Sequence, residues 1–298
     1  NWFFPTLSLG FRKETVISRI NRAVSRRVRR VAHYVSDKGR VRACDVRGHV
    51  ILLDVESAIE DYRANTYEIK EPETLEWIER FFQPGDVMYD VGANVGLYSL
   101  FAAKHLGDGK VFAFEPEALN YAKLSKNIYL NGLSGVVLPC CFAITDRLGF
   151  DTFNLNPETF DTFVTGKELV AGSALHSFGD TEDFRGKEFR PLHVQGMLGV
   201  PIDELWQSWG MDFPNHLKVD VDGLEDKIIT GAAQTLYDQR LKSILIEVSG
   251  ELGDADPVLQ RIIQAGFTRV TEVGAHSSEM LKGTQYEDCV NSVFIRGV

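Results

Sequence analysis

The chain has few cysteines and histidines, and neither residue type occurs in a pattern that binds metal. The four cysteines have no metal-ligand spacing, and two of them, Cys140 and Cys141, are adjacent. Adjacent side chains of a strand point to opposite faces, so no shared role of this pair is indicated. The seven histidines have no ligand spacing, which argues against a zinc site. We therefore expect buried thiols in a reducing compartment and a cytoplasmic protein.

Long apolar runs and targeting signals are also missing. No apolar run reaches the roughly 18 residues that a membrane-spanning helix needs. Residues 1–5 have no initiator Met, and the basic-then-apolar order of a signal peptide is lacking, which suggests a trimmed or mature chain. The 298 residues, 44% of them hydrophobic, suffice for one large α/β domain with an appendage.

Positive charge is scarce outside the first 50 residues. That segment holds twelve lysines and arginines against three acids, a net charge of +9, which leaves −19 for the remainder of a chain whose total is −10. An acidic body repels nucleic acid, so we expect no nucleic-acid partner.

The basic segment has helical periodicity. Residues 12–35 carry an apolar stripe of Val16, Ile20, Val24, Val28, Val31 and Val35. Two interpretations stay open: peripheral contact of this helix with an anionic membrane surface, or packing on the protein itself. The absence of Trp and Phe from the stripe favours packing.

Beyond residue 86, short apolar runs alternate with helical patterns, which indicates βαβ units and a parallel sheet. The predicted strands are 87–91, 110–114, 136–141, 216–219, 243–248, 267–273 and 292–296. The predicted helices are 73–82, 97–106, 118–130, 225–236 and 256–265. Residues 145–200 interrupt the alternation and are predicted to be an insertion of strands and loops. We assign 1–70, with its β-like pieces, to an appendage and 71–298 to the α/β domain.

The strongest functional signal is the run Asp90-Val91-Gly92-Ala93-Asn94-Val95-Gly96, between a predicted strand and a helix. Gly92 allows a tight turn and close approach of a ligand, and Gly96 allows close packing where the helix begins. The first glycine of the dinucleotide fingerprint is replaced by Asp90, whose carboxylate would repel a pyrophosphate but suits an ammonium group. S-adenosylmethionine has an ammonium group, a sulfonium and no phosphate. The loop therefore predicts this cofactor, bound through Asp90, Gly92, Asn94 and Gly96.

Two further segments extend this predicted cofactor site. Glu115 ends the next strand, 25 residues after Asp90, and an acid in that place accepts hydrogen bonds from ribose hydroxyls. Ala143 and Asp146 follow the third strand, where adenine should lie, although an ordinary turn explains them equally well.

Acidic residues also follow the fourth and fifth strands. Asp220 lies at the predicted methyl-donor end of the cofactor, and Asp220, His216 and Glu247 are our candidates for the base that takes a proton from the acceptor. Asp220, Asp222 and Glu247 also form a possible oxygen-only site for a divalent cation. Asp220 and Asp222 alternate in an extended chain and need not converge, so we expect a reaction without metal.

These motifs together resemble the FkbM family of S-adenosylmethionine-dependent methyltransferases. The resemblance runs from about residue 70 to the C-terminus and rests on the segments 84–86, 90–96, 114–116, 131–133, 202–205, 218–225 and 246–248, together with Asn127. It implies a Rossmann-like class I methyltransferase sheet of seven mostly parallel strands, the last antiparallel. It also implies methyl transfer, usually to a hydroxyl of a sugar, glycolipid or secondary metabolite. Asp222 departs from the family's usual Glu.

Two alternatives to a methyltransferase remain at this point. One is a Rossmann oxidoreductase that binds NAD, which the missing first glycine disfavours. The other is a non-catalytic protein that keeps the fold for binding, which retention of Asp90 and Glu115 disfavours. The insertion supplies aromatic side chains that either form the acceptor wall or pack locally, namely Phe153, Phe160, Phe163 and Phe178.

Overall fold

A computed structural model describes residues 40–156, 170–174, 176–182, 186–221, 223–249, 255–273 and 289–297. The chain divides into two compact units, Asn1–Val41 and Arg42–Val298, and the description below concerns the second. The predicted helix at 12–35 lies outside the described residues, as do Phe160, Phe163 and Asp222. Within the described ranges, no helix is long and apolar enough to cross a membrane.

The core of the fold is a seven-stranded sheet in the order β12-β13-β11-β10-β3-β4-β5. Its strands are β3 (Val87–Val91), β4 (Lys110–Phe114), β5 (Val137–Cys140), β10 (His216–Val219), β11 (Ser243–Ser249), β12 (Phe267–Arg269) and β13 (Cys289–Arg296). β13 pairs antiparallel with both of its neighbours, while β5, β4, β3, β10 and β11 are all parallel. The predicted Rossmann-like methyltransferase sheet with an antiparallel last strand is thus confirmed.

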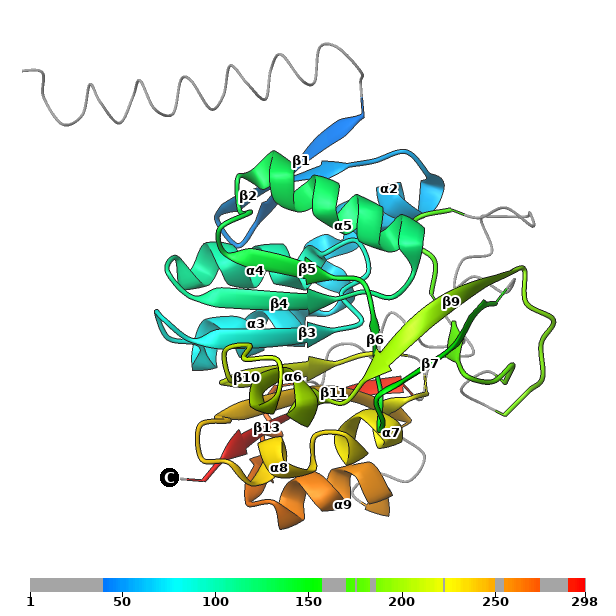
Figure 1. The fold of residues 1–298 in the computed structure, drawn as a ribbon. Coiled ribbons are helices and arrows are strands. Elements are labelled where there is room, and N and C mark those ends of the chain that lie inside the picture. Colours follow the sequence, from blue (N-terminus) through cyan, green and yellow to red (C-terminus); the bar gives the residue numbers. More distant parts are fainter. Residues whose placement is uncertain are drawn as a thin grey trace, which may run out of the picture. The chain divides into compact units, whose positions relative to one another are not determined.

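Helices cover both faces of this sheet (Figure 1). One layer contains α3 (Pro72–Phe81), α4 (Leu97–Leu106) and α5 (Ala118–Asn131). The other contains α6 (Ile202–Gln207), α7 (Glu225–Thr230), α8 (Ala233–Tyr237) and α9 (Pro257–Gln264). Alternate strand residues supply the two cores: Met88 and Val111 face the first layer, whereas Tyr89 and Phe112 face the second. Burial on both faces explains why these strands are continuously apolar.

Residues 42–70 belong to the same compact unit as the sheet. The hairpin of β1 (Val41–Val46) and β2 (His49–Asp54) packs on α5, whose Asn131 accepts from the Leu52 N–H and donates to the Leu52 carbonyl. Tyr67 of α2 (Ala58–Lys70) is buried in the same core as the helices α3 and α4.

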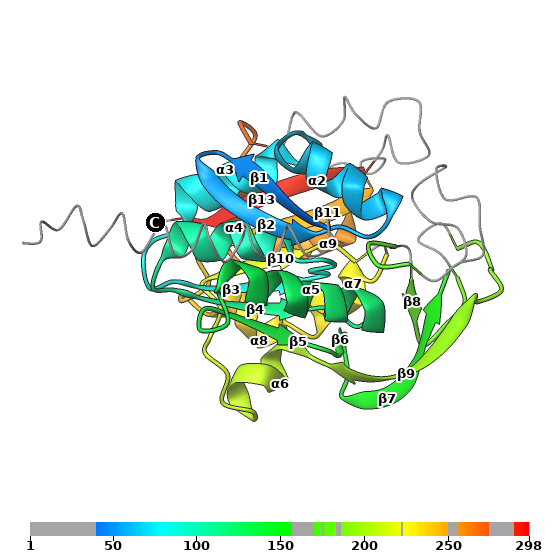
Figure 2. The same ribbon diagram turned by 90° about the horizontal axis from the view of Figure 1, so that it is seen from above.

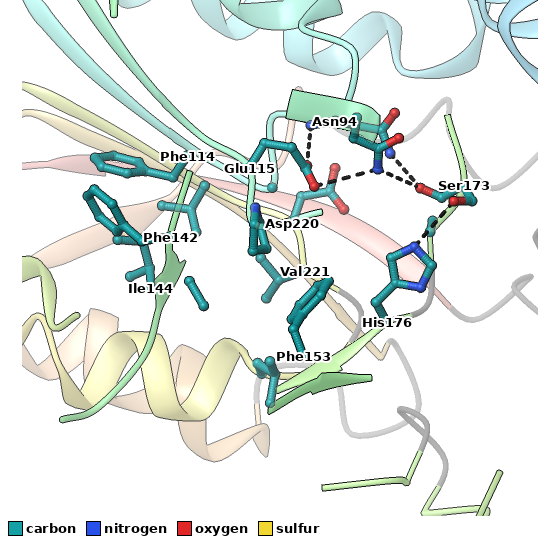
Figure 3. A pocket seen from close by; sticks show the side chains of 17 residues that line it. Asn94, Phe114, Glu115, Phe142, Ile144, Phe153, Ser173, His176, Asp220 and Val221 are labelled. Carbon is teal, nitrogen blue, oxygen red and sulfur yellow. Dashed lines mark hydrogen bonds between the residues drawn. The ribbon is translucent and has the colours of Figure 1, made fainter. Parts of the chain in front are cut away.

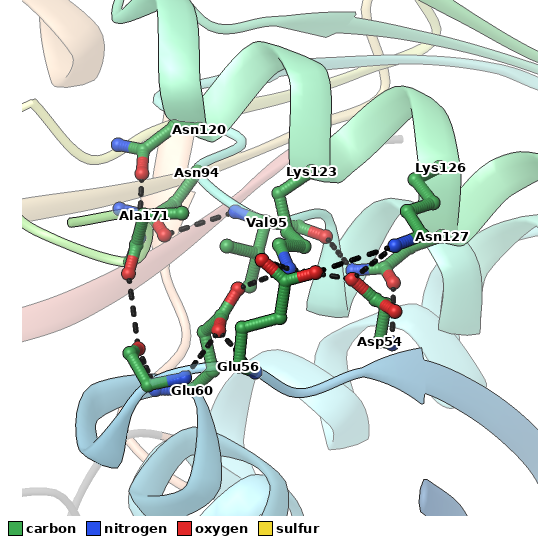
Figure 4. Close-up of polar contacts among 12 residues, drawn as sticks. Asp54, Glu56, Glu60, Asn94, Val95, Asn120, Lys123, Lys126, Asn127 and Ala171 are labelled. Carbon is green, nitrogen blue, oxygen red and sulfur yellow. Dashed lines mark hydrogen bonds and ion pairs between the residues drawn. The ribbon is translucent and has the colours of Figure 1, made fainter. Parts of the chain in front are cut away.

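A buried ion cluster also ties this N-terminal part to α5 (Figure 4). Lys123 lies 2.6 Å from Asp54 and 2.9 Å from Glu60, and all three side chains are almost completely buried. Removing one member would leave an uncompensated buried charge, so the cluster fixes α2 and β2 against the domain.

The insertion forms a second sheet in the order β6-β9-β7-β8, seen at the edge of the molecule in Figure 2. Its strands are β6 (Ala143–Ile144), β7 (Gly149–Leu155), β8 (Ser177–Phe178) and β9 (His193–Val200). Phe153 and Phe178 are buried with Met197 in a small core of their own. The insertion leaves the main sheet after β5 and returns before α6, which places it beside the carboxyl ends of the parallel strands.

Candidate functional site

The loop after β3 has the backbone geometry that its glycines suggest. Gly92, Asn94 and Gly96 all have positive φ angles, of 83°, 49° and 93°. A Cβ atom at Gly92 would overlap the backbone carbonyl oxygen of Asp220, so only glycine fits there. Gly96 is the N-cap residue of α4, and a Cβ atom there would overlap the Leu124 side chain. At Gly92, the loop therefore lies in close contact with Asp220 at the end of β10.

Glu115 follows β4 and turns its carboxylate towards this loop. Its Oε2 accepts a hydrogen bond from the Asn94 N–H at 2.7 Å, and its Oε1 accepts one from the Glu117 N–H at 2.9 Å. Burial raises the pKa of Glu115 to about 7, although these bonds favour the charged form. A buried carboxylate near neutrality is typical of a functional site.

Gly92, Asn94 and Glu115 line one pocket that is partly open to solvent (Figure 3). Its walls come from the carboxyl ends of β3, β4 and β10 and from the insertion. The described lining residues are Val91, Gly92, Asn94, Phe114, Glu115, Pro116, Asn120, Phe142, Ala143, Ile144, Phe153, Ser173, Ala174, His176, Asp220, Val221 and Leu224. They include two acids and no lysine or arginine. Such a lining suits a cationic ligand with an apolar ring better than a pyrophosphate.

A buried lysine sets the charge state of Asp220. Lys218 Nζ lies 2.7 Å from Asp220 Oδ2 and 3.8 Å from Asp90 Oδ1. Burial alone would raise the pKa of Asp220, but Lys218, Lys70 and a hydrogen bond with Glu247 outweigh it, so the pKa is lowered. The lowered pKa means that Asp220 is ionised at neutral pH.

The structure brings about half of the predicted site residues to the pocket. Gly92, Asn94, Glu115, Ala143 and Asp220 line it. The other predicted residues do not: Asp90, Gly96, Asp146, Glu247 and His216.

Asp90, Glu247 and Asp146 occupy different positions behind or beside that wall. Asp90 is buried, accepts a hydrogen bond from Ser99 Oγ at 2.5 Å and has a pKa raised by burial. Glu247 contacts Asp220 from the next strand. Asp146 is exposed and accepts a hydrogen bond from Thr145.

His216 needs correction as a candidate base. It is the first residue of β10 and completely buried, at the opposite end of the strand from Asp220. Its ring stacks on Phe82, with centroids 3.8 Å apart, and its nitrogens contact Ser243 Oγ at 2.7 Å and Asp86 Oδ2 at 2.9 Å. These contacts are those of a core residue. The catalytic edge of a parallel sheet is also its carboxyl edge, and His216 lies at the opposite one.

Sequence reasoning missed several residues of the pocket. Phe142, one position before Ala143, provides an apolar wall, and Asn120 reaches the pocket from α5. His176 comes from the insertion, where burial lowers its pKa to about 4. Its Nδ1 accepts from the Asn156 N–H, so the ring proton resides on Nε2, 3.3 Å from Ser173 Oγ. A lone histidine carries no sequence signal, whereas Asn120, in the first turn after Glu115, could have been suspected.

Among the residues that the structure describes, no group of three His, Cys, Asp or Glu side chains could hold a metal ion. Asp222, one member of the possible cation site, lies outside those residues. A reaction without metal therefore stays a prediction.

Comparisons with known proteins identify a family. The model of the methyltransferase FkbM domain matches residues 90–269, more than half of the chain. The 31-O-demethyl-FK506 methyltransferase FkbM of Streptomyces tacrolimicus is 27% identical over 207 residues, which are 64% of this chain and 75% of that protein. The hexuronic acid methyltransferase AglP of Haloferax volcanii is 23% identical over 274 residues, which are 90% of this chain and 96% of that protein.

The solved structures similar to this chain include a methyltransferase of low sequence identity. Precorrin-6y C5,15-methyltransferase of Geobacter metallireducens superposes with a TM-score of 0.41 at 12% identity, covering 78% of this chain and 88% of that one.

Proposed function

The chain belongs to the FkbM family of S-adenosylmethionine-dependent methyltransferases, and from this premise we propose that it methylates a hydroxyl group of a sugar, glycolipid or other small molecule. One observation carries the proposal: Glu115 and Asp220 face the same pocket, on either side of the glycine loop. The names of the two relatives, which refer to an O-demethyl substrate and to a hexuronic acid, support an oxygen acceptor.

The acidic and apolar lining of the pocket suits S-adenosylmethionine, which carries a positive charge and an adenine ring. Glu115 would accept hydrogen bonds from the ribose hydroxyls, with Phe142 and Ala143 beside the adenine. Gly92 lies in the pocket wall, where its backbone would contact the methionine part, and Asp220 supplies negative charge near the sulfonium. When bound, the cofactor supplies an activated methyl group, so orientation of the acceptor accounts for most of the acceleration.

Asp220 is the residue that we assign to the acceptor proton. It is ionised because Lys218 Nζ lies 2.7 Å away and lowers its pKa. His176 is excluded as a base, because its Nδ1 is occupied by the Asn156 N–H and its Nε2 carries the ring proton. The His176 Nε2–H can donate to Ser173 Oγ, which leaves the Ser173 hydroxyl to donate to the acceptor. Phe153 would contact the apolar face of the acceptor.

The first test is cofactor binding measured by calorimetry. The parent should bind S-adenosylmethionine and S-adenosylhomocysteine and should not bind NAD. Glu115→Ala should weaken S-adenosylhomocysteine binding at least tenfold, since it removes charge-assisted hydrogen bonds of about 1.5–3 kcal/mol each. Tight NAD binding without binding of either methionine derivative would refute the proposal.

Asp203→Ala is a matched control for this test. Asp203 also accepts hydrogen bonds from two backbone N–H groups, those of Gln234 and Thr235, but it lies outside the pocket. The Asp203→Ala variant should be less stable than the parent and should keep the parent's affinity for S-adenosylhomocysteine. Methyl transfer to a panel of sugars and hydroxylated metabolites then tests the acceptor class, and transfer to amines alone would exclude a hydroxyl acceptor.

A further inference from the structure

A short segment of the insertion is held over the cofactor pocket by two asparagines. The backbone carbonyl of Ser173 accepts hydrogen bonds from Asn94 Nδ2 at 2.8 Å and from Asn120 Nδ2 at 3.0 Å (Figure 3). Asn120 Oδ1 also accepts the Gly172 N–H at 2.6 Å. Asn120 is 1% exposed, so these bonds are shielded from water.

Both asparagines also bind Glu115. The Asn94 N–H donates to Oε2 at 2.7 Å, and Asn120 Nδ2 lies 3.5 Å from Oε1. The two carboxylate oxygens are therefore each tied to an asparagine that holds Ser173. The glycine loop and α5 therefore meet at this one carboxylate, and the insertion is bonded to both of them through Ser173.

We propose that Asn94 and Asn120 are positioning residues that fix the Glu115 carboxylate for ribose binding through the Gly172–Ser173 segment, so that the insertion is a structural part of the cofactor site. The inference rests on the proposed cofactor role of Glu115. By linkage, cofactor binding should stabilise the docked segment as much as the docked segment favours the cofactor.

The groups around Glu115 affect its pKa, so the proposed role can be measured through the pH dependence of cofactor affinity. Glu117 at the start of α5 and Cys141 after β5 interact with it, and Asp220 and His176 line the same pocket. No lysine or arginine is among the described lining residues, so amide donors such as Asn120 help to keep the carboxylate charged. Ribose hydroxyls donate to the charged form, so affinity should fall as the pH drops through the pKa of Glu115, about 7.

Asn120→Asp tests this inference most sharply. The variant keeps the size of the side chain and the acceptor for the Gly172 N–H, but it loses both donated bonds and adds a negative charge beside Glu115. We expect S-adenosylhomocysteine affinity at pH 7.5 to fall at least tenfold. We also expect the pH at which half of the affinity is lost to rise by about one unit, since a nearby like charge raises the pKa. Asn120→Ala should lose affinity with a smaller rise in that pH.

Asn131→Ala is the control, because Asn131 is buried on the same helix and bonds to the Leu52 backbone instead. It should lose thermal stability but keep the affinity and its pH midpoint. In hydrogen exchange, S-adenosylhomocysteine should protect residues 170–174 in the parent and in Asn131→Ala, and less in Asn120→Ala.

Parent-like affinity and pH midpoint in both Asn120 variants would overturn the inference while leaving the proposed function intact. Unchanged exchange of residues 170–174 on ligand binding would also overturn it. A parent that binds no S-adenosylhomocysteine would refute the proposed function itself, and the inference with it.

Discussion

At the scale of single residues, Gly92 tolerates the least change. It has a φ angle of 83°, and a Cβ would overlap the Asp220 carbonyl oxygen. We expect Gly92→Ala to destabilise the fold by roughly 2 kcal/mol, because both strain and overlap act, and to abolish detectable S-adenosylhomocysteine binding by shifting the loop from β10. Thermal unfolding and calorimetry measure the two effects.

Gly135→Ala is the control for this prediction. Gly135 lies in the turn after α5, and a Cβ there would meet nothing within 4 Å. This variant should be as stable as the parent and should bind equally well. If Gly92→Ala behaved like Gly135→Ala, the close contact between the glycine loop and Asp220 would have no functional role.

The pocket residues at the strand ends of the main sheet were easier to predict than the pocket residues elsewhere. Gly92 and Glu115 follow buried strands, and strand ends of a parallel sheet converge whatever the loops do. Asp146 follows a strand too, but the chain turns into β6 and leaves its side chain exposed. His216 lies away from the pocket because it is the first residue of its strand. The position of a residue within a strand, first or last, decides which edge of the sheet its side chain occupies.

At the scale of elements, α2 shows a signal that periodicity alone does not reveal. Residues 41–70 contain the expected strands and also the helix α2, which we did not predict. Its apolar stripe is weak, but Ser57 and Glu60 form a capping box: the Ser57 hydroxyl accepts the Glu60 N–H, and the Glu60 carboxylate accepts the Ser57 N–H. This four-residue motif marks the start of the helix.

The capping box leads to a stability prediction. Ser57→Ala should lower the free energy of unfolding by about 1 kcal/mol. The Glu60 N–H loses its acceptor, and the reciprocal hydrogen bond from the Ser57 N–H is weakened. The melting temperature should fall by roughly 2–4 °C. Ser134→Ala, an exposed serine in the turn after α5, is the control and should melt with the parent. Equal melting of the two variants would show that the cap does not stabilise α2.

Other element boundaries depend on contacts that no local pattern contains. Strands 87–91 and 110–114 and helix 97–106 have the predicted bounds, because alternation and glycines define them locally. The predicted helix 225–236 is instead two helices, α7 and α8, separated at Gly231. A Cβ at Gly231 would overlap the carbonyl oxygen of Thr145, so the break accommodates a residue more than 80 positions away.

At the scale of the whole molecule, the pocket joins two kinds of structure. The methyltransferase sheet supplies the glycine loop, Glu115 and Asp220, whereas the insertion supplies Phe153, Ser173 and His176. The sheet half resembles a known family and could be predicted from motifs. The insertion half is positioned by hydrogen bonds to Asn94 and Asn120, which are long-range and visible only in the folded chain.

The division into two compact units leads to a last prediction, on residues 1–40. No described lining residue of the pocket precedes Val91, and Arg42–Val298 is compact by itself. Deleting residues 1–40 should therefore leave S-adenosylhomocysteine affinity within about twofold of the parent, measured by calorimetry. A larger loss would mean that the basic segment contributes to the cofactor site.

The same deletion tests the two interpretations of the amphipathic helix predicted at 12–35. Residues 1–50 carry a net charge of +9, which attracts anionic lipid at low salt, but the apolar stripe contains no Trp or Phe to insert into the interface. Electrostatic attraction alone is screened within about 8 Å at physiological salt. We therefore expect the parent and the deletion variant to float equally with anionic liposomes at 0.15 M salt. Flotation of the parent alone would establish peripheral membrane contact and would favour a lipid-linked acceptor over a freely diffusing one.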